Sequence, residues 1–245
     1  MQLLRSISIV AGVLSATVVN ALPTVQMVDK RAFGGKQLTG CSLTGAVVPI
    51  SSGPNTLAAP DPGLKVTRVV LGRGTQNYTC ADSQSTTIPA AAGALAVLYD
   101  ASCLVSKEPS LLHQLPNILV SVSSSLTQTI LQRIAGEAVV VGHHYFAPDF
   151  STPVFDFRIT TGQTQIFTGV RDQAVPALTS ASRGGLGDQQ FGAVDWLRLK
   201  AVPAKTVDYK LAYRVETAGG KAPATCWGRP ATFSIEYATE YWFLN

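Results

Sequence analysis

The sequence contains few charged and few aromatic residues. Charged residues make up 14% of the 245 residues and aromatic residues 8%, whereas 46% are hydrophobic. This composition is typical of a compact folded domain and argues against disorder. The Lys and Arg residues form no basic run, so the phosphate-neutralising surface of a nucleic-acid binder is missing. We therefore expect no nucleic-acid partner.

The apolar run at the N-terminus is too short to cross a membrane. A membrane-spanning helix takes roughly 20 predominantly apolar residues, and the run Ile7–Val19 is both shorter and interrupted by small polar residues. It follows the positive Arg5 and is followed by Ala21, a small residue that a signal peptidase accepts. This pattern predicts a signal peptide over residues 1–21.

A dibasic pair predicts a second cleavage. Lys30 and Arg31 form a site for the processing proteases of the secretory pathway, so we expect residues 22–31 to be a propeptide and the mature chain to begin at Ala32. Removal of residues 1–31 leaves 214 residues and lowers the net charge from +4 to +2. We expect a secreted, extracellular protein that has no membrane attachment after processing.

The chain has only four cysteines, all of them after the predicted cleavage site. An even number in an oxidising compartment predicts two disulfides, and three pairings are open. No two cysteines have the two-to-four-residue spacing of a zinc knuckle, and the three histidines supply no matching pair, so we expect neither a metal site nor a cofactor. The cysteines are Cys41, Cys80, Cys103 and Cys226.

The mature chain divides into an arm and one domain. Residues 32–63 are rich in Gly, Pro, Ser and Thr, which favours an irregular arm, and residues 64–245 carry ten short runs of β-branched and aromatic residues. Such runs, separated by turn residues, predict an all-β fold, a β-sandwich or a flattened barrel, which we expect to be monomeric. The runs are Lys65–Leu71, Thr75–Cys80, Ala94–Cys103, Ala138–Phe146, Val154–Ile159, Gln165–Val170, Val194–Val202, Tyr209–Thr217, Ala231–Tyr237 and Glu240–Phe243.

Three segments have sequence patterns that are not typical of strands. Apolar residues recur at helical spacing over Pro109–Ala135, and Pro116 must break or kink this segment, so we expect two short helices. The Ser-rich stretch 121–125 is equally compatible with a loop. Thr160–Gly162 predicts the turn of a hairpin, and Gly184–Gly187 predicts a flexible surface loop.

Six local strings, in one consistent order, resemble the secreted fungal branch of the domain of unknown function 3455 family. The resemblance covers nearly the whole mature chain and implies no established activity. It also implies the pairing Cys80–Cys226 with Cys41–Cys103, with a local Cys80–Cys103 bridge as the alternative. The strings are Gly72–Cys80, Leu98–Cys103, Gly142–Phe146, Val194–Leu199, Tyr213–Gly220 and Tyr237–Phe243.

Members of this family often carry a malate dehydrogenase label, which the sequence does not support. A dinucleotide site needs a glycine-rich turn between a strand and a helix. Gly184–Gly187 follows no predicted strand and opens no apolar-periodic helix.

Side chains alternate along a strand, so Gln76, Tyr78 and Cys80 share one face of the predicted strand. A disulfide at Cys80 would turn this face inward and leave Asn77, in the sequon Asn77–Thr79, facing solvent. We therefore expect glycosylation at Asn77.

The adjacent His143 and His144 would project to opposite faces of their strand, so they cannot bind one metal ion. The histidine that matches the family resemblance is His144, followed by Tyr145. The candidate polar site combines five residues, namely Gln76, Tyr78, Asp100, His144 and Tyr145.

Motifs for catalysis are weak. No Gly-x-Ser-x-Gly elbow is present, and nothing marks a pair among the carboxylates that glycoside hydrolysis would use. The candidate carboxylates are Asp100, Glu137, Asp149, Asp156, Asp195 and Glu216.

Aromatic residues offer either core packing, which the alternation of strands favours, or a platform for sugars. They are Tyr145, Phe146, Trp196, Trp227 and Tyr241–Phe243.

We expect a non-enzymatic protein that binds a glycan or an extracellular protein. The alternative is a secreted hydrolase with a site around Gln76, His144 and a carboxylate such as Asp100.

Overall fold

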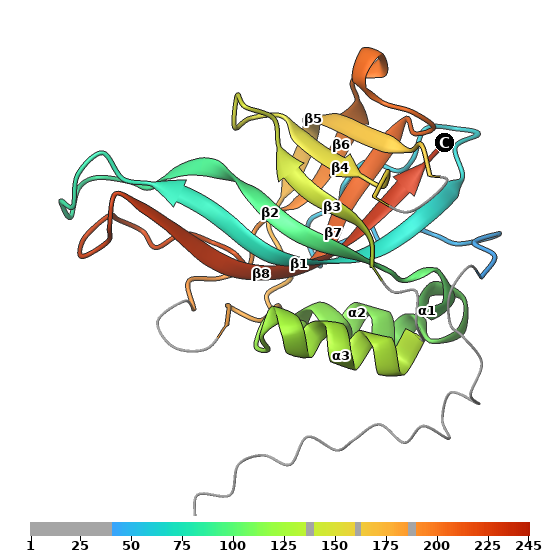
Figure 1. Cartoon of the computed structure of the whole chain (residues 1–245), viewed down its shortest axis with the longest axis horizontal. Coiled ribbons are helices and arrows are strands. Elements are labelled where there is room, and N and C mark those ends of the chain that lie inside the picture. Colours follow the sequence, from blue (N-terminus) through green and yellow to red (C-terminus); the bar gives the residue numbers. More distant parts are fainter. Residues whose placement is uncertain (1–40, 136–139, 160–162, 186–189) are drawn as a thin grey trace, which may run out of the picture.

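The computed structural model describes residues 41–135, 140–159, 163–185 and 190–245 (Figure 1). Within them, eight antiparallel strands follow one another around a closed barrel, and β8 pairs with β1. The prediction of an all-β flattened barrel with short helices is confirmed. The strands are β1 (Val66–Thr79), β2 (Ala90–Asp100), β3 (Val140–Phe146), β4 (Pro153–Asp156), β5 (Ile166–Val175), β6 (Trp196–Ala201), β7 (Leu211–Gly219) and β8 (Thr232–Leu244).

Two of these strands each join two runs that the sequence predicted as separate. The break expected between Leu71 and Thr75 is wrong, because Gly72 and Gly74 are paired with both neighbouring strands. A Cβ at Gly74 would lie 1.9 Å from the carbonyl oxygen of Leu95. The glycines therefore permit a close approach within a continuous β1 and mark no turn. The two runs expected over 231–243 likewise form the single strand β8.

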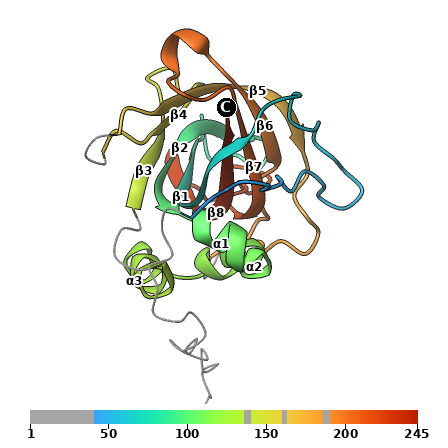
Figure 2. The ribbon, with the colours of Figure 1, turned by 90° about the vertical axis from the view of Figure 1, so that its right-hand side faces the viewer.

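Three helices form a layer on one side of the barrel (Figures 1 and 2). The two predicted helices are present as α2 (Pro109–Leu119) and α3 (Ser124–Ala135), but α2 continues through Pro116. The helix α2 ends at Leu119, just before the Ser-rich stretch 121–125. A first helix, α1 (Ser102–Lys107), was not predicted, and a short 3-10 helix, η2, covers Pro203–Lys205.

The first helix replaces the end of a predicted strand. We expected a strand over Ala94–Cys103, but β2 ends at Asp100. The Asp100 carboxylate accepts a hydrogen bond from the backbone N–H of Ser102, at 2.7 Å. This bond satisfies one of the free N–H groups at the start of α1, so Asp100 has a structural role at the strand-to-helix junction.

The protein has two layers of apolar packing. Inside the barrel, aromatic rings of β4, β5 and β8 contact one another, and this cluster holds Phe155, Phe167, Tyr237, Tyr241 and Phe243. Outside the barrel, a second cluster joins the strands to α1–α3 and to the segment before β1. Most of the aromatic residues considered for a sugar platform are thus core residues, since Trp196, Tyr241, Trp242 and Phe243 are buried.

The described part of the N-terminal arm, residues 41–63, is irregular apart from an isolated bridge between Ser51 and Thr56. Val48 and Leu57 bury their side chains against the outer cluster. The Cys41–Cys103 disulfide ties the arm to α1, and the Cys80–Cys226 disulfide ties the end of β1 to the β7–β8 connection. This is the pairing that the family resemblance implies. The predicted signal peptide, the propeptide and Ala32 lie outside the described residues.

Two predicted loops differ from the structure or lie outside it. Gly184 and Gly185 are buried, beside Gly219 and the carbonyl oxygen of Val120, so this half of the expected surface loop is packed. The strands β4 and β5 pair antiparallel, as the predicted hairpin requires, but β4 ends at Asp156 and the turn Thr160–Gly162 lies outside the described residues.

Among the described helices, none has the length and apolar character needed to cross a membrane.

Candidate functional site

The structure does not bring the five predicted polar residues together. Gln76 and Tyr78 lie beside the chain that follows β7, where the Tyr78 hydroxyl donates a hydrogen bond to the Gly220 carbonyl oxygen at 2.7 Å. The Nε2 atom of Gln76 is buried and has no hydrogen-bond partner among the described residues. Asp100 lies at the junction of β2 and α1, which is a different part of the fold.

His144 is a core residue of the barrel. Its ring stacks on Phe155, with centroids 4.1 Å apart and an angle of 8° between the planes. The Nδ1 atom lies 2.9 Å from the Val154 carbonyl oxygen, and since a carbonyl only accepts, Nδ1 carries the proton. Burial lowers the pKa of His144 to about 4, so its imidazole is neutral at neutral pH. It is therefore not available to a solvent-borne substrate.

Tyr145 and the aspartates near it form a surface network. The Tyr145 hydroxyl donates to Asp156 at 3.2 Å, and Asp156 pairs with Arg158 at 2.7 Å. The Arg158 hydrogen bond lowers the pKa of Asp156 to about 2. In the β3–β4 turn, the Asp149 carboxylate accepts bonds from residues 151 and 152, which lower its pKa to about 2. Both aspartates are thus ionised, Asp156 at the end of β4 and Asp149 in the turn before it.

Asn77 lies on the face of β1 opposite to Gln76 and Tyr78, as the strand alternation predicts. Its Oδ1 atom accepts hydrogen bonds from the hydroxyls of Thr75, at 3.1 Å, and Ser234, at 2.8 Å. Glycosylation at this position stays a prediction. Glu137, one of the candidate carboxylates, lies outside the described residues.

A cluster of ionisable groups lies between α2 and the barrel, and the sequence did not predict that its members come together. We call it the acid–base cluster, and it consists of Glu216, one of the candidate carboxylates, with His113 and Glu240. Glu240 on β8 is completely buried. Its Oε1 atom lies 2.9 Å from Nδ1 of His113, and its Oε2 atom accepts the indole N–H of Trp242, also at 2.9 Å. The hydrogen bond to Glu240 raises the pKa of His113.

Glu216 contributes the second carboxylate of the acid–base cluster. It lies where the pairing of β7 with β8 is irregular, between Val215 and Ala218, and its φ angle is +46°. A positive φ is strained for a residue with a side chain, and such residues concentrate at functional sites. Burial and the charge of Glu240 raise the pKa of Glu216 to about 7. A carboxyl group of this kind exchanges protons near neutral pH, as a general acid or base must.

A signal for this cluster exists in the sequence. Ala238, Glu240 and Trp242 are alternate residues of one strand and share a face, in a run that is otherwise largely apolar. A charged residue at such a position is buried and needs hydrogen-bond partners. His113 and Glu216 carry no such local signal. Their proximity depends on the packing of α2 against β7 and β8, which a sequence pattern does not specify.

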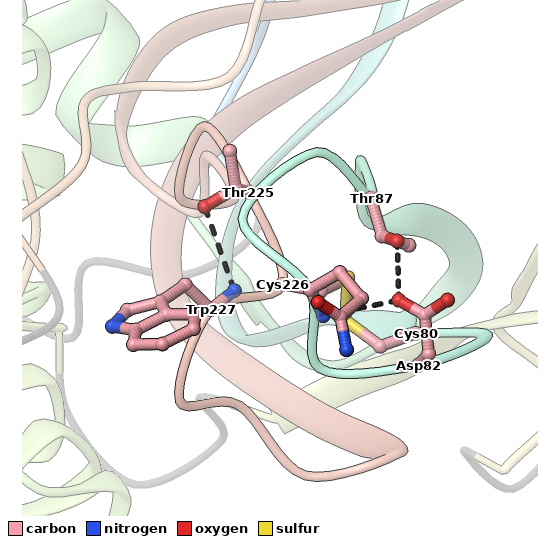
Figure 3. Close-up of a disulfide and its surroundings, with 7 residues drawn as sticks. Cys80, Asp82, Thr87, Thr225, Cys226 and Trp227 are labelled. Atoms are coloured by element: carbon pink, nitrogen blue, oxygen red, sulfur yellow. Dashed lines mark hydrogen bonds between the residues drawn. A yellow bond between two sulfur atoms is a disulfide. The ribbon is translucent and has the colours of Figure 1, made fainter.

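One large aromatic side chain projects into solvent from the β7–β8 connection. Of the three tryptophans, Trp196 and Trp242 are buried, whereas Trp227 is 70% exposed. Figure 3 shows its indole pointing away from the adjacent Cys80–Cys226 disulfide. The backbone N–H of Cys226 donates to the Thr87 carbonyl oxygen at 2.7 Å, which fixes the loop further.

A second set of bonds holds the facing loop in place. Between β1 and β2, the Asp82 carboxylate accepts the backbone N–H of Gln84 at 3.0 Å and the hydroxyl of Thr87 (Figure 3). The loop that donates to Cys226 is thus itself ordered by Asp82. Trp227 is therefore presented by two loops that are joined by a covalent bond and by hydrogen bonds.

Comparison with known families gives one match. The model of the family described as Protein of unknown function (DUF3455) matches residues 60–245. The chain belongs to the DUF3455 family. No curated protein and no solved structure matches the chain.

The DUF3455 match contains all eight strands, the acid–base cluster and the Trp227 loop, and it begins only near the end of the arm. Within the described residues of this DUF3455 member, no group of three or more His, Cys, Asp or Glu side chains is arranged to hold a metal ion. The acid–base cluster offers proton transfer and hydrogen bonding as its chemistry, because the raised pKa of Glu216 lies near neutral pH.

Proposed function

We propose that this protein is secreted and binds a glycan in the extracellular space through Trp227, without catalysis. The predicted signal peptide and dibasic site support secretion, and the two disulfides fit an oxidising compartment. The observation that carries the proposal is the 70% exposure of Trp227 on a loop closed by a disulfide.

The physical argument for a sugar rests on the shape of the indole. An exposed aromatic ring offers a flat apolar face with a polar edge, on which the C–H face of a sugar ring stacks. Thr225 and Asp82 lie on the same two loops and carry a hydroxyl and a carboxylate (Figure 3). Because the loops are ordered before binding, little conformational entropy is lost when a ligand arrives.

The test uses the secreted, processed protein on a glycan array and in polysaccharide pull-down assays. We expect a bound glycan, binding weakened at least about tenfold by Trp227→Ala, and most binding retained by Trp227→Tyr, which keeps a ring. Phe150→Ala is the matched control, because Phe150 is an exposed aromatic residue, 64% accessible, on the distant β3–β4 turn. An absence of glycan binding, or equal binding by Trp227→Ala, would overturn the proposal.

Mass spectrometry of the same preparation tests the secretory part of the proposal. We expect the N-terminus at Ala32, after cleavage behind Arg31, and a glycan mass on the peptide that contains Asn77. An intact N-terminus at Met1 in material recovered from inside the cell would contradict secretion.

A hydrolase is the second candidate function, and the acid–base cluster is the observation that favours it. The position of His144 in the core removes the support for the site expected around Gln76, His144 and Asp100. Glu216, with its raised pKa and partial exposure beside His113, has the properties of a general acid. Hydrolysis of a panel of esters and glycosides that is lost in Glu216→Gln would establish this function. No turnover, or equal turnover in the variant, would exclude the cluster as its site.

A further inference from the structure

A cleft of about 1070 Å³ lies between the N-terminal arm and the barrel. The arm contributes small and aliphatic side chains, and the barrel contributes the start of β1 and the end of β8. None of the described lining residues has an aromatic ring, so this cleft lacks the surface on which sugars stack. The aliphatic lining includes Leu43, Val47, Val48, Ile50, Leu64, Val66 and Leu244.

Two cations also line the cleft, Lys65 and Arg68. The Arg68 guanidinium donates from Nε to the hydroxyl of Tyr209 at 2.7 Å and from its Nη2 atom to Gln163 at 3.2 Å. Its Cζ atom lies 4.4 Å from the centre of the Phe157 ring. These three contacts fix the guanidinium at the cleft.

Arg68 has no carboxylate partner among the described residues, although it is half-buried. The two buried arginines each have one, since Arg73 pairs with Glu236 and Arg198 pairs with Asp61 and Asp172. A partly buried charge that lacks a counter-ion is costly, and an anion that reaches it removes the cost.

We propose that the cleft binds a long-chain amphipathic carboxylate, such as a fatty acid. The aliphatic chain lies along the arm and the apolar side chains of β1 and β8, and the carboxylate pairs with Arg68 and Lys65. Burial of the chain supplies the binding energy, while the guanidinium supplies the preference for an anion. This ligand follows from the combination of an aliphatic wall with an uncompensated cation.

Asp100 is the negative group that faces the same cleft. Its Oδ1 atom is engaged by the N–H of Ser102 at the start of α1, which holds the carboxylate at that junction. A ligand carboxylate is repelled from Asp100 and attracted to Arg68, so the two side chains together set the direction in which the ligand lies.

The test is the displacement of a fluorescent fatty-acid probe from the delipidated, processed protein. We expect palmitate to compete, and its methyl ester and hexadecanol to compete at least about tenfold more weakly, because neither carries a charge. Arg68→Met is expected to reduce this preference strongly, with Lys65 left as the remaining cation, while the weak binding of the ester stays unchanged. Arg171→Met is the matched control, since Arg171 is exposed on β5.

A second variant keeps the test decisive if Arg68→Met fails to fold. Val47 is 81% exposed and lines the cleft, so Val47→Asp changes its polarity without disturbing the core. We expect this variant to weaken the binding of both ligands, and that of palmitate more than that of its ester, because the introduced carboxylate repels the carboxylate of palmitate. No palmitate binding, equal binding of palmitate and its ester, or an unaffected Val47→Asp would overturn the proposal. Trp227→Ala is expected to bind palmitate normally, so the glycan proposal and this one fail independently.

Discussion

His113 on α2 and Glu240 on β8 form a side-chain contact of 2.9 Å that connects the helical layer to the wall of the barrel. The contact raises the pKa of His113, so Nδ1 of His113 is the donor. Glu240 is completely buried, and the indole of Trp242 supplies its other donor. The carboxylate is tolerated inside the protein because each oxygen atom has a partner.

We predict that His113→Ala destabilises the protein more at pH 5.5 than at pH 8.5. The pKa of His113 is raised in the folded protein. Its contribution to the free energy of unfolding is therefore complete below the ordinary pKa of 6.5 and is lost as the pH rises through the folded pKa. Loss of a partner from a buried charge costs several kcal/mol, and for the half-exposed His113 we expect about 2 kcal/mol at pH 5.5. Urea unfolding at both pH values measures this difference.

The control for this substitution is His143→Ala, which removes an exposed histidine from β3. It is expected to change the free energy of unfolding by less than about 0.5 kcal/mol at either pH. An equal penalty for His113→Ala at both pH values would show that the charge on His113 has no part in the contact.

We predict that Glu216→Gln stabilises the protein above pH 7 relative to the wild type. The folded pKa of Glu216, about 7, lies above the ordinary value of 4.5. The wild type therefore loses stability as the pH rises from 4.5 through 7, and the amide does not. Since Glu216 is partly exposed, solvent screening reduces the effect to about 1 kcal/mol. Thermal unfolding across this pH range measures it, and a constant difference between the two proteins would contradict the raised pKa.

The fold class was predictable because strand alternation and turn residues are local. The continuity of β1 was not, because Gly72 and Gly74 are turn residues by composition and become strand residues only where Tyr241 and Leu95 approach them closely. Pro116 is likewise a helix-breaking residue by type, and yet α2 continues through it. A proline is tolerated inside α2 when packing of the surrounding residues, such as Leu112 and Leu115, outweighs the lost hydrogen bond.

The candidate site was less predictable than the fold. Gln76 and Tyr78 share a face of β1, as predicted, because that depends only on alternation. His144 and Asp100 were grouped with them on motif similarity alone, and the closed barrel places one in its core and the other at the start of α1. The exposure of Trp227 depends on the loop that Cys226 anchors, so composition could not separate it from the buried tryptophans.

We predict that His144→Phe weakens the acid sensitivity of the protein. The folded pKa of His144, about 4, lies below its ordinary value of 6.5. Its contribution to stability is therefore present above pH 6.5 and is lost as the pH falls through 4, by up to about 3 kcal/mol. Phenylalanine keeps the stacking on Phe155 but cannot be protonated, so its unfolding free energy should fall less between pH 7 and pH 4.

The matched control is His143→Phe, which places the same ring on the exposed neighbour. It is expected to keep the pH dependence of the wild type. At pH 7 His144→Phe is expected to cost about 1 kcal/mol, since the Val154 carbonyl oxygen loses a donor. If His144→Phe shows the acid sensitivity of the wild type, another group governs it.

Removal of the Cys80–Cys226 disulfide is expected to cost more stability than removal of Cys41–Cys103. The two bridges span 146 and 62 residues, and the chain-entropy relation gives about 5 and about 4 kcal/mol for loops of these lengths. Urea unfolding of the two double Cys→Ala variants measures the order.

The variants also separate the two binding proposals, because Cys80–Cys226 fixes the Trp227 loop and Cys41–Cys103 fixes the arm. Loss of the first should weaken glycan binding, and loss of the second should weaken fatty-acid binding. The reverse pattern would mean that neither bridge orders the surface to which it is attached.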